Sequence, residues 1–181
     1  EAILSEDGSW DKKPDAAIVV FGEDPYAETQ GDRRNVDYDP TDGIKLLKRF
    51  QAEGILTVAV FITGRPLWTN PEINASDAFV VAWLPGSEGG GIADVIIAGA
   101  DGEPSHDFTG RLSFSWPATA VQTETNVGDD DYNPLFEYGY GLAYSAPGAV
   151  LPLPEISGLD ETAPGSGSVI EYGDPVGSWR L

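Results

Sequence analysis

The chain has 181 residues, and 41% are hydrophobic, including 5 Trp, 7 Tyr and 7 Phe, which is enough apolar material for the core of one ordinary domain with a tail. Its 30 acidic and 10 basic residues give a formal charge of −20, which repels nucleic-acid backbones and anionic lipid, so nucleic-acid partners are excluded. The absence of cysteine excludes disulfides, a thiolate nucleophile and cysteine-based metal sites. No run approaches the roughly 18 apolar residues of a membrane-spanning helix, so no membrane span is expected.

The beginning of the chain changes character at residue 16. Residues 1–15 mix charges with Gly and Pro without any period, and we interpret them as a lead-in from an upstream part of a longer chain. Residues 16–22 (AAIVVFG) form a continuous apolar run with β-branched side chains, typical of a parallel strand buried on both faces. Residues 23–39 then show no helical or strand period, and polar connections of this length are commonly functional.

A helix and a second strand are predicted after this loop. Asp39 or Thr41 is the expected N-cap of the helix and Gly54 its expected C-terminal cap. The helix buries one apolar side, made of Ile44, Leu47 and Phe50. Residues 55–64 (ILTVAVFITG) have the pattern of a second buried strand, which ends at a Gly-Arg-Pro break.

The alternation of strands and helices continues to residue 100. A helical turn is predicted over residues 71–76, a third buried strand over residues 77–84 (DAFVVAWL), and a helix over residues 92–100 after the glycine-rich segment 85–91 (PGSEGGG). This order indicates the α/β class. We therefore expect a three-layer α/β sandwich with a mostly parallel, doubly wound sheet.

Beyond residue 100 the chain is rich in Gly, Pro, Thr and Asp. Residues 111–117 (RLSFSWP) are predicted to form one more strand at a sheet edge, where it can run antiparallel, because a proline ends it. The domain is expected to span residues 16–145. Residues 146–168 are interpreted as a Pro/Gly-rich linker, and residues 169–181 as the start of a following module or a docking tail.

The loop after the first strand is where chemistry is expected, because ligands of open α/β sheets bind beyond the carboxyl ends of the strands. A carboxylic acid there can act as a general acid if burial raises its pKa toward the working pH. Any one of 30 acidic residues is more often a solvated charge, however, and spacing alone does not choose among them. The charged and aromatic candidates in the loop are Glu23, Asp24, Tyr26, Glu28, Asp32, Arg33 and Arg34.

Two further motifs favour structural roles. Residues 85–91 lack the Lys-Ser/Thr ending of a P-loop and the spacing of a dinucleotide fingerprint, so we interpret them as a glycine-dependent turn. His106 has no second histidine with which to build a metal centre, and no catalytic triad can be argued for it. We therefore expect neither a metal ion nor a cofactor.

The tryptophans and one short motif leave alternatives open. Trp68, Trp83 and Trp116 can stack on sugar faces, but such residues are more often core or cleft-wall aromatics. Asn74 begins an Asn-Ala-Ser glycosylation sequon, a pattern that arises often by chance and requires a host that glycosylates.

Five motifs follow one another along the chain: IVVFGEDPYAETQGDRRNV (18–36), VFITGRPL (60–67), ASDAFVVAWLPGSEGGGIADVI (75–96), TGRLSFSWP (109–117) and NPLFEYGYGL (133–142). In this order they resemble the C-terminal α/β sandwich domain of glycoside hydrolase family 3. The resemblance runs through most of residues 16–144, and the closest likeness is to β-glucosidases and β-glucan exohydrolases.

The resemblance implies that catalysis is divided between two domains. In this family an N-terminal (β/α)8 barrel supplies an aspartate nucleophile, and the sandwich domain supplies an acid/base glutamate from a loop over the pocket. That glutamate matches Glu28 in the run A-E-T-Q-G-D-R, and Glu23 is the runner-up, otherwise a structural carboxylate near the site. Asp32 and Arg33 match the family's D-R element and are expected to brace the loop through a charge-assisted hydrogen bond.

The same resemblance implies the reaction and its partners. Glu28 would protonate the glycosidic oxygen and later activate water, about 5–5.5 Å from the barrel nucleophile, in a retaining mechanism. Tyr26, Trp68 and Trp83 are the expected wall of the glucose pocket. The expected partners are a β-glucan, a cello-oligosaccharide or a laminari-oligosaccharide as substrate and the barrel domain of the same chain. Without that barrel, the isolated chain is expected to be inactive.

Two interpretations from other classes stay open. One is a noncatalytic carbohydrate-binding or structural α/β module in which Glu28 is merely solvated. The other is a nucleotide-binding regulator that uses residues 85–91, which the charge of −20 disfavours. The acidic composition and the absence of cysteine fit an extracellular or periplasmic enzyme.

Overall fold

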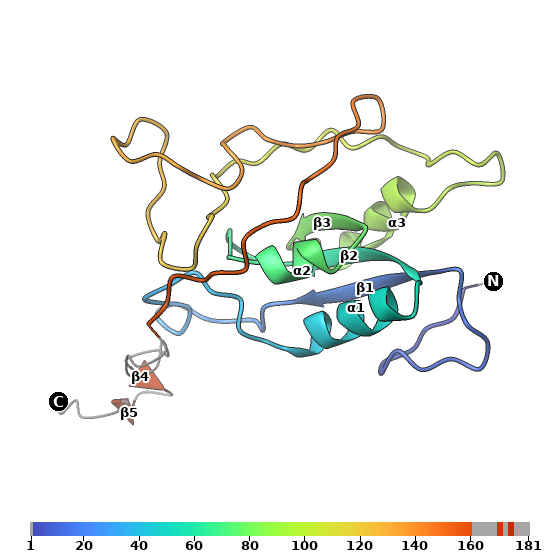
Figure 1. Cartoon of the computed structure of the whole chain (residues 1–181), viewed down its shortest axis with the longest axis horizontal. Helices are drawn as coiled ribbons and strands as arrows, with labels where there is room; N and C mark the ends of the chain where they lie inside the picture. Colours follow the sequence, from blue (N-terminus) through green and yellow to red (C-terminus); the bar gives the residue numbers. More distant parts are fainter. Residues whose placement is uncertain (1, 161–169, 172–173, 176–181) are drawn as a thin grey trace.

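The computed structural model describes residues 2–160, 170–171 and 174–175. Strands and helices alternate up to residue 96, and a long course of turns and loops follows (Figure 1). In chain order the elements are β1 (Ala16–Gly22), α1 (Asp42–Ala52), β2 (Leu56–Ile62), α2 (Asn70–Asn74), β3 (Ala78–Trp83), a 3-10 turn (Gly86–Glu88), α3 (Gly90–Ile96), β4 (Ile170–Glu171) and β5 (Asp174–Pro175).

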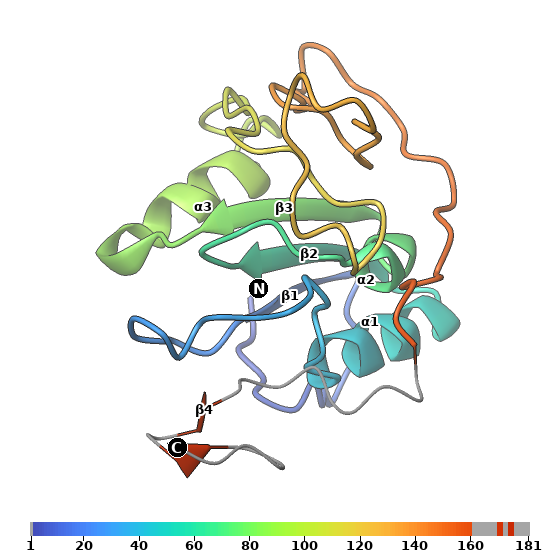
Figure 2. The ribbon, with the colours of Figure 1, turned by 90° about the vertical axis from the view of Figure 1, so that its left-hand side faces the viewer.

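The main sheet has three parallel strands in the order β1-β2-β3. Its register pairs Val19 with Ala59, and Ala59 with Phe79. Right-handed crossovers that advance in one direction place their helices on one face. Accordingly, α1 and α2 lie on one side of the sheet and α3 lies on the other (Figure 2). The predicted α/β class with a parallel sheet is confirmed.

Helix α1 packs on the sheet through its predicted apolar side. Leu47 is fully buried and Phe50 is 5% exposed. The helix stops where Gly54 adopts a φ of +64°, a conformation that glycine reaches without a steric penalty, as predicted for its C-terminal cap. The buried cluster around the helix consists of Val19, Leu47, Phe50, Ile55, Ala59 and Ala75.

The lead-in also packs on α1. The Trp10 ring lies 5.5 Å from the Phe50 ring, measured between centroids, and the Arg49 guanidinium carbon lies 4.7 Å from the centre of the Trp10 ring. Arg49 Nη2 also donates to the carbonyl oxygen of Gly8. The segment before β1 is therefore attached to the domain by aromatic and cation–π contacts.

A second cluster lies toward the carboxyl ends of the strands. The fully buried Phe61 ring is at its centre, 5.0 Å from the ring of Tyr38 and 6.5 Å from the ring of Trp116. Leu67, also fully buried, comes from the connection between β2 and α2. This cluster joins the loop after β1, that connection and the segment around Trp116 into one packed unit.

The prediction of a strand over residues 111–117 is wrong. Only one antiparallel bridge forms there, between Trp116 and Phe136, although Leu112 N also donates to Tyr140 O at 2.8 Å. Residues between these contacts bend away, with Phe114 60% exposed, so no continuous ladder forms.

The helix predicted over residues 92–100 is placed too late in the chain. It runs from Gly90 to Ile96, because the glycine-rich segment forms the 3-10 turn and enters the helix directly. At the other end Ile97 has extended backbone, with φ −109° and ψ 122°, which stops the helix.

Part of the predicted linker lies against α2 (orange in Figure 1). We call its residues 153–157, which contact α2 and the segment at Ala120, the strap. The side chain of Asn74 forms two hydrogen bonds with the backbone of Leu153. Its Nδ2 donates to the carbonyl oxygen at 2.9 Å, and its Oδ1 accepts from the N–H at 2.8 Å. Asn70 Nδ2 donates to Pro154 O at 2.8 Å, and Ala120 N donates to Ser157 O at 2.8 Å. Residues 161–168 of the predicted linker, and all of the predicted tail except β4 and β5, lie outside the described residues.

Candidate active site

The loop after β1 begins inside the sheet. The N–H of Glu23 donates to the carbonyl oxygen of Ile62 at 3.0 Å, which continues the pairing of β1 with β2 by one residue. Gly22 allows this close approach, because a Cβ atom at that position would lie 2.0 Å from the same carbonyl oxygen. The start of the loop is therefore held by the sheet itself.

Both carboxylate oxygens of Glu23 are engaged. Its side chain is 9% exposed, and Oε1 accepts from Arg65 Nε at 3.0 Å and lies 2.9 Å from Arg65 Nη2. Oε2 accepts from the hydroxyl of Thr63 at 2.7 Å. Thr63 and Arg65 both follow β2, so charge-assisted hydrogen bonds join the two neighbouring strand ends.

Arg65 also reaches the middle of the loop. Its Nη1 donates to the carbonyl oxygen of Gly31 at 2.5 Å, and its guanidinium carbon lies 4.4 Å from the centre of the Tyr26 ring. Tyr26 in turn packs on Gly31, where a Cβ atom would lie 2.3 Å from the ring. Sequence reasoning missed Arg65, although its place directly after the second predicted strand puts it at the same sheet edge as the loop.

Glu28 lies in an exposed turn between Tyr26 and Gly31. Thr29, the next residue, has a φ of +69°, a left-handed conformation that is rare for a β-branched residue. The N–H of Asp32 donates to Thr29 O at 3.2 Å and closes the turn. The Glu28 carboxyl group is thus presented to solvent by a closed turn beside the sheet edge.

The predicted Asp-Arg pair has separate contacts. Arg33 Nη2 lies 3.5 Å from Oδ2 of Asp39, which ties the middle of the loop to its end. Asp32 has an exposed side chain and contributes its backbone N–H to the turn. The loop also ends on a parallel bridge between Asp37 and Trp68.

The three aromatic candidates have different environments. Tyr26 is 43% exposed beside the turn. Trp68 is 7% exposed and belongs to the core. Trp83 is half-buried at the end of β3, 6.3 Å from the Trp116 ring between centroids, with a φ of +54° that marks strain in a bulky residue. Tyr26 is therefore the most accessible of the three.

Next to the loop end, carboxyl groups lie partly or fully out of solvent. Burial, and then the nearby charge of Asp39, raises the pKa of Asp37. Burial raises the pKa of Glu72 to about 7, and Asp37 adds to the effect. Burial, followed by the charge of Glu72, raises the pKa of Tyr38 to about 12. Sequence reasoning missed Glu72, because nothing in the pattern of the short helix α2 marks it as buried.

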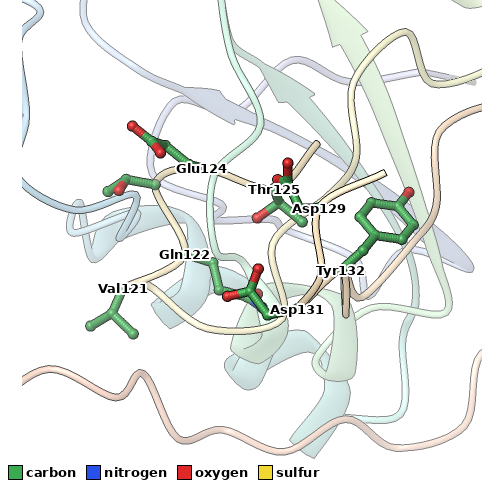
Figure 3. Close-up of a pocket in the computed structure, with 8 residues that line it drawn as sticks. Val121, Gln122, Glu124, Thr125, Asp129, Asp131 and Tyr132 are labelled. Carbon is green, nitrogen blue, oxygen red and sulfur yellow. The ribbon is translucent and has the colours of Figure 1, made fainter. Parts of the chain in front are cut away.

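Two cavities adjoin this end of the molecule. One of about 460 Å³ includes Arg33, Arg65 and Tyr138 in its wall. The other, of about 200 Å³, is lined only by residues between Val121 and Tyr132, with several carboxylates around it (Figure 3). Within the described residues no group of three or more Asp, Glu or His side chains can hold a metal ion, and no described helix is long and apolar enough to cross a membrane.

Comparison with known proteins decides the family. Residues 2–144 match the model of the glycosyl hydrolase family 3 C-terminal domain. The chain belongs to this family. An exo-1,3/1,4-β-glucanase from a Pseudoalteromonas species contains a region with the same fold, with a TM-score of 0.83 and 52% sequence identity over 86% of this chain and 20% of that chain.

Two curated relatives of this family 3 domain are β-glucosidases. The lysosomal β-glucosidase of Dictyostelium discoideum is 34% identical in an alignment of 142 residues that covers 72% of this chain and 16% of the relative. The periplasmic β-glucosidase of Salmonella typhimurium is 30% identical in an alignment of 168 residues that covers 80% of this chain and 21% of the relative. The chain therefore spans about a fifth or less of the length of these relatives.

Proposed function

We propose that this family 3 domain supplies the general acid/base of a retaining, exo-acting β-glucosidase or β-glucan glucohydrolase, and that Glu28 is that residue. The observation that supports Glu28 is its exposure in a closed turn at the carboxyl end of a parallel sheet, where α/β folds bind ligands. Glu23 is the weaker candidate, because Thr63 and Arg65 occupy both of its carboxylate oxygens.

The reaction needs two carboxyl groups on opposite sides of the scissile bond. An aspartate from an N-terminal (β/α)8 barrel attacks the anomeric carbon while Glu28 gives its proton to the glycosidic oxygen, which leaves with the aglycone. Glu28, now a carboxylate, takes a proton from the water that attacks the glycosyl-enzyme, which releases the sugar and the aspartate. The two carboxyl groups lie about 5–5.5 Å apart in such a mechanism, so docking of the two domains is part of catalysis.

The proposed substrates are β-glucans and cello- or laminari-oligosaccharides, with Tyr26 forming part of the glucose pocket. The similarity to two β-glucosidases and an exo-1,3/1,4-β-glucanase supports this proposal. An extracellular or periplasmic location is part of the same proposal, since one relative is periplasmic. No cofactor is needed for this chemistry.

The experiment compares Glu28→Ala with Glu23→Ala in the full-length enzyme that contains this domain. Cellobiose needs a proton donor for its leaving group, whereas an activated aryl β-glucoside does not. We expect Glu28→Ala to lose activity on cellobiose, to retain glycosylation by the aryl glucoside, and to form β-glucosyl azide when azide is added. The 181-residue chain alone is the inactive control.

Other outcomes separate the alternatives. If Glu23→Ala alone shows the azide rescue, the mechanism stands and the assignment to Glu28 is wrong. If neither variant shows it, this domain is a noncatalytic module that shapes the pocket or binds carbohydrate.

A further inference from the structure

We propose that Arg65 is a positioning residue for Glu28, which fixes both sides of the turn that carries this carboxyl group and thereby controls the proton-transfer step. The inference rests on the proposed role of Glu28 and adds a residue from a different element. Arg65 follows β2, whereas the turn belongs to the loop after β1.

Arg65 is anchored on its own side. It precedes Pro66, which restricts its backbone to extended conformations, and its N–H donates to the hydroxyl of Thr63 at 3.2 Å. Thr63 is fully buried directly after β2. The side chain of Arg65 is 26% exposed and its guanidinium is paired with Glu23, which is itself hydrogen-bonded to the sheet through Ile62.

From this anchor the guanidinium reaches residues on both sides of Glu28. The Tyr26 ring, two positions before Glu28, lies under the guanidinium at 4.4 Å, and the Gly31 carbonyl, three positions after it, accepts from Nη1 at 2.5 Å. One planar group thus uses its edge for Glu23 and Gly31 and its face for Tyr26. A lysine ammonium has neither the fork nor the flat face, so it cannot make all of these contacts.

The turn is strained, so it needs the contacts of Arg65 with Tyr26 and Gly31 to keep its conformation. Thr29 holds a φ of +69° directly after Glu28. A β-branched residue keeps a left-handed conformation only where its surroundings over-determine it. The contact of Arg65 with Gly31 lies two residues further along, so loss of Arg65 lets the turn relax and carries the Glu28 carboxyl group away from its position.

The effect is therefore expected in the step that uses Glu28. Misplacement of a catalytic group by about 1 Å can reduce the rate about 10²-fold. We expect Arg65→Ala in the full-length enzyme to lower kcat on cellobiose about 10–100-fold with little change in KM, and to change glycosylation by an activated aryl β-glucoside less than about threefold. Arg65→Lys should recover only a minor part of the loss.

Arg49→Ala is the matched control. Arg49 also forms an ion pair, with Glu53 at 3.7 Å, and also lies over an aromatic ring, that of Trp10, but it belongs to α1. Its loss costs comparable surface interactions without touching the turn. We expect Arg49→Ala to leave the ratio of the two activities unchanged, and melting temperatures show whether each variant is folded.

Glu28→Ala, measured in parallel, separates this inference from the proposed function. If Glu28→Ala loses both substrates equally, Glu28 is not the acid/base and the inference falls with it. If Glu28→Ala shows the leaving-group dependence while folded Arg65→Ala loses both activities equally, or neither, Arg65 is a structural residue and the positioning role is refuted. If Arg65→Ala does not fold, the same comparison is made with Arg65→Lys.

Discussion

Glu72 is a carboxyl group at the start of α2 that is 4% exposed, and burial raises its pKa to about 7. The charged groups that act on it are Asp37 and Glu155, which raise the pKa, and Lys48, which lowers it. An unfolded chain ionises Glu72 near pH 4.5, so the folded state holds a proton there that the unfolded state has lost. Stability from this group is complete below about pH 4.5 and is lost as the pH rises through 7.

We therefore predict that Glu72→Gln removes this pH dependence. Between pH 4.5 and pH 8 the free energy of unfolding of Glu72→Gln should gain up to about 3 kcal/mol relative to wild type, because the glutamine does not ionise. Urea unfolding across this range measures the difference. Glu6→Gln, at an exposed position of the lead-in, is the control for the loss of one negative charge. A difference between Glu72→Gln and wild type that does not change with pH would contradict the assignment.

At the scale of secondary structure elements, prediction succeeded where hydrophobic pattern and burial coincide. The apolar run over residues 55–64 predicts the central strand β2, whose side chains are mostly buried. Residues 16–22 form the predicted strand β1, but this strand lies at an edge of the described sheet with Ile18 and Val20 46% and 64% exposed, so the predicted burial on both faces is wrong. Residues 111–117 alternate polar and apolar side chains, but Phe114 is exposed and only one bridge forms among the described residues there, since a partner strand is a tertiary property. Local pattern identifies the strands of the sheet, whereas burial and pairing depend on segments that are distant in sequence.

The candidate site follows the same division. The loop after β1 was predicted because its length and composition are unusual for a connection. The roles of Arg65 and Glu72 could not be predicted, because they depend on Glu23, Gly31 and Asp37, which are distant in sequence. Contacts between residues so far apart leave no periodic pattern in the local sequence.

The strap on α2 provides a test at the element scale. The side chain of Asn74 makes three hydrogen bonds, two with the backbone of Leu153 and one with the Glu155 carboxylate at 2.9 Å. Loss of partly buried hydrogen bonds costs about 1–2 kcal/mol, so Asn74→Ala should lower the melting temperature by a few degrees. Amide exchange at Leu153 should accelerate at the same time.

Asn126→Ala, a substitution in an exposed loop, is the matched control and should change neither quantity. If amide exchange at Leu153 is the same in Asn74→Ala and in wild type, the prediction is wrong, because the other contacts of the strap then hold it without the hydrogen bonds of Asn74. The same amide belongs to the Asn-Ala-Ser sequon, so a glycan on Asn74 would have to displace the strap.

At the scale of the whole molecule, both the negative charge and the exposed apolar surface affect how the melting temperature depends on salt concentration. The formal charge of −20 is spread over one small domain, and mutual repulsion of the carboxylates disfavours the folded state at low ionic strength. Ile18, Val20 and Leu56 are also 46%, 64% and 63% exposed on neighbouring strands of the sheet. Salt weakens the repulsion and promotes association through apolar patches, so the two effects have to be separated.

We predict that the melting temperature rises by several degrees between about 10 mM and about 0.5 M NaCl, because the Debye length falls from about 30 Å to a few Å. The double substitution Asp130→Lys and Asp131→Lys, on an exposed loop, lowers the excess negative charge and should give a shallower rise. Scans at two protein concentrations isolate the electrostatic part, since association makes the melting temperature depend on concentration. A flat or falling series at low protein concentration would show that attraction within the four ion pairs outweighs the repulsion among the described carboxylates.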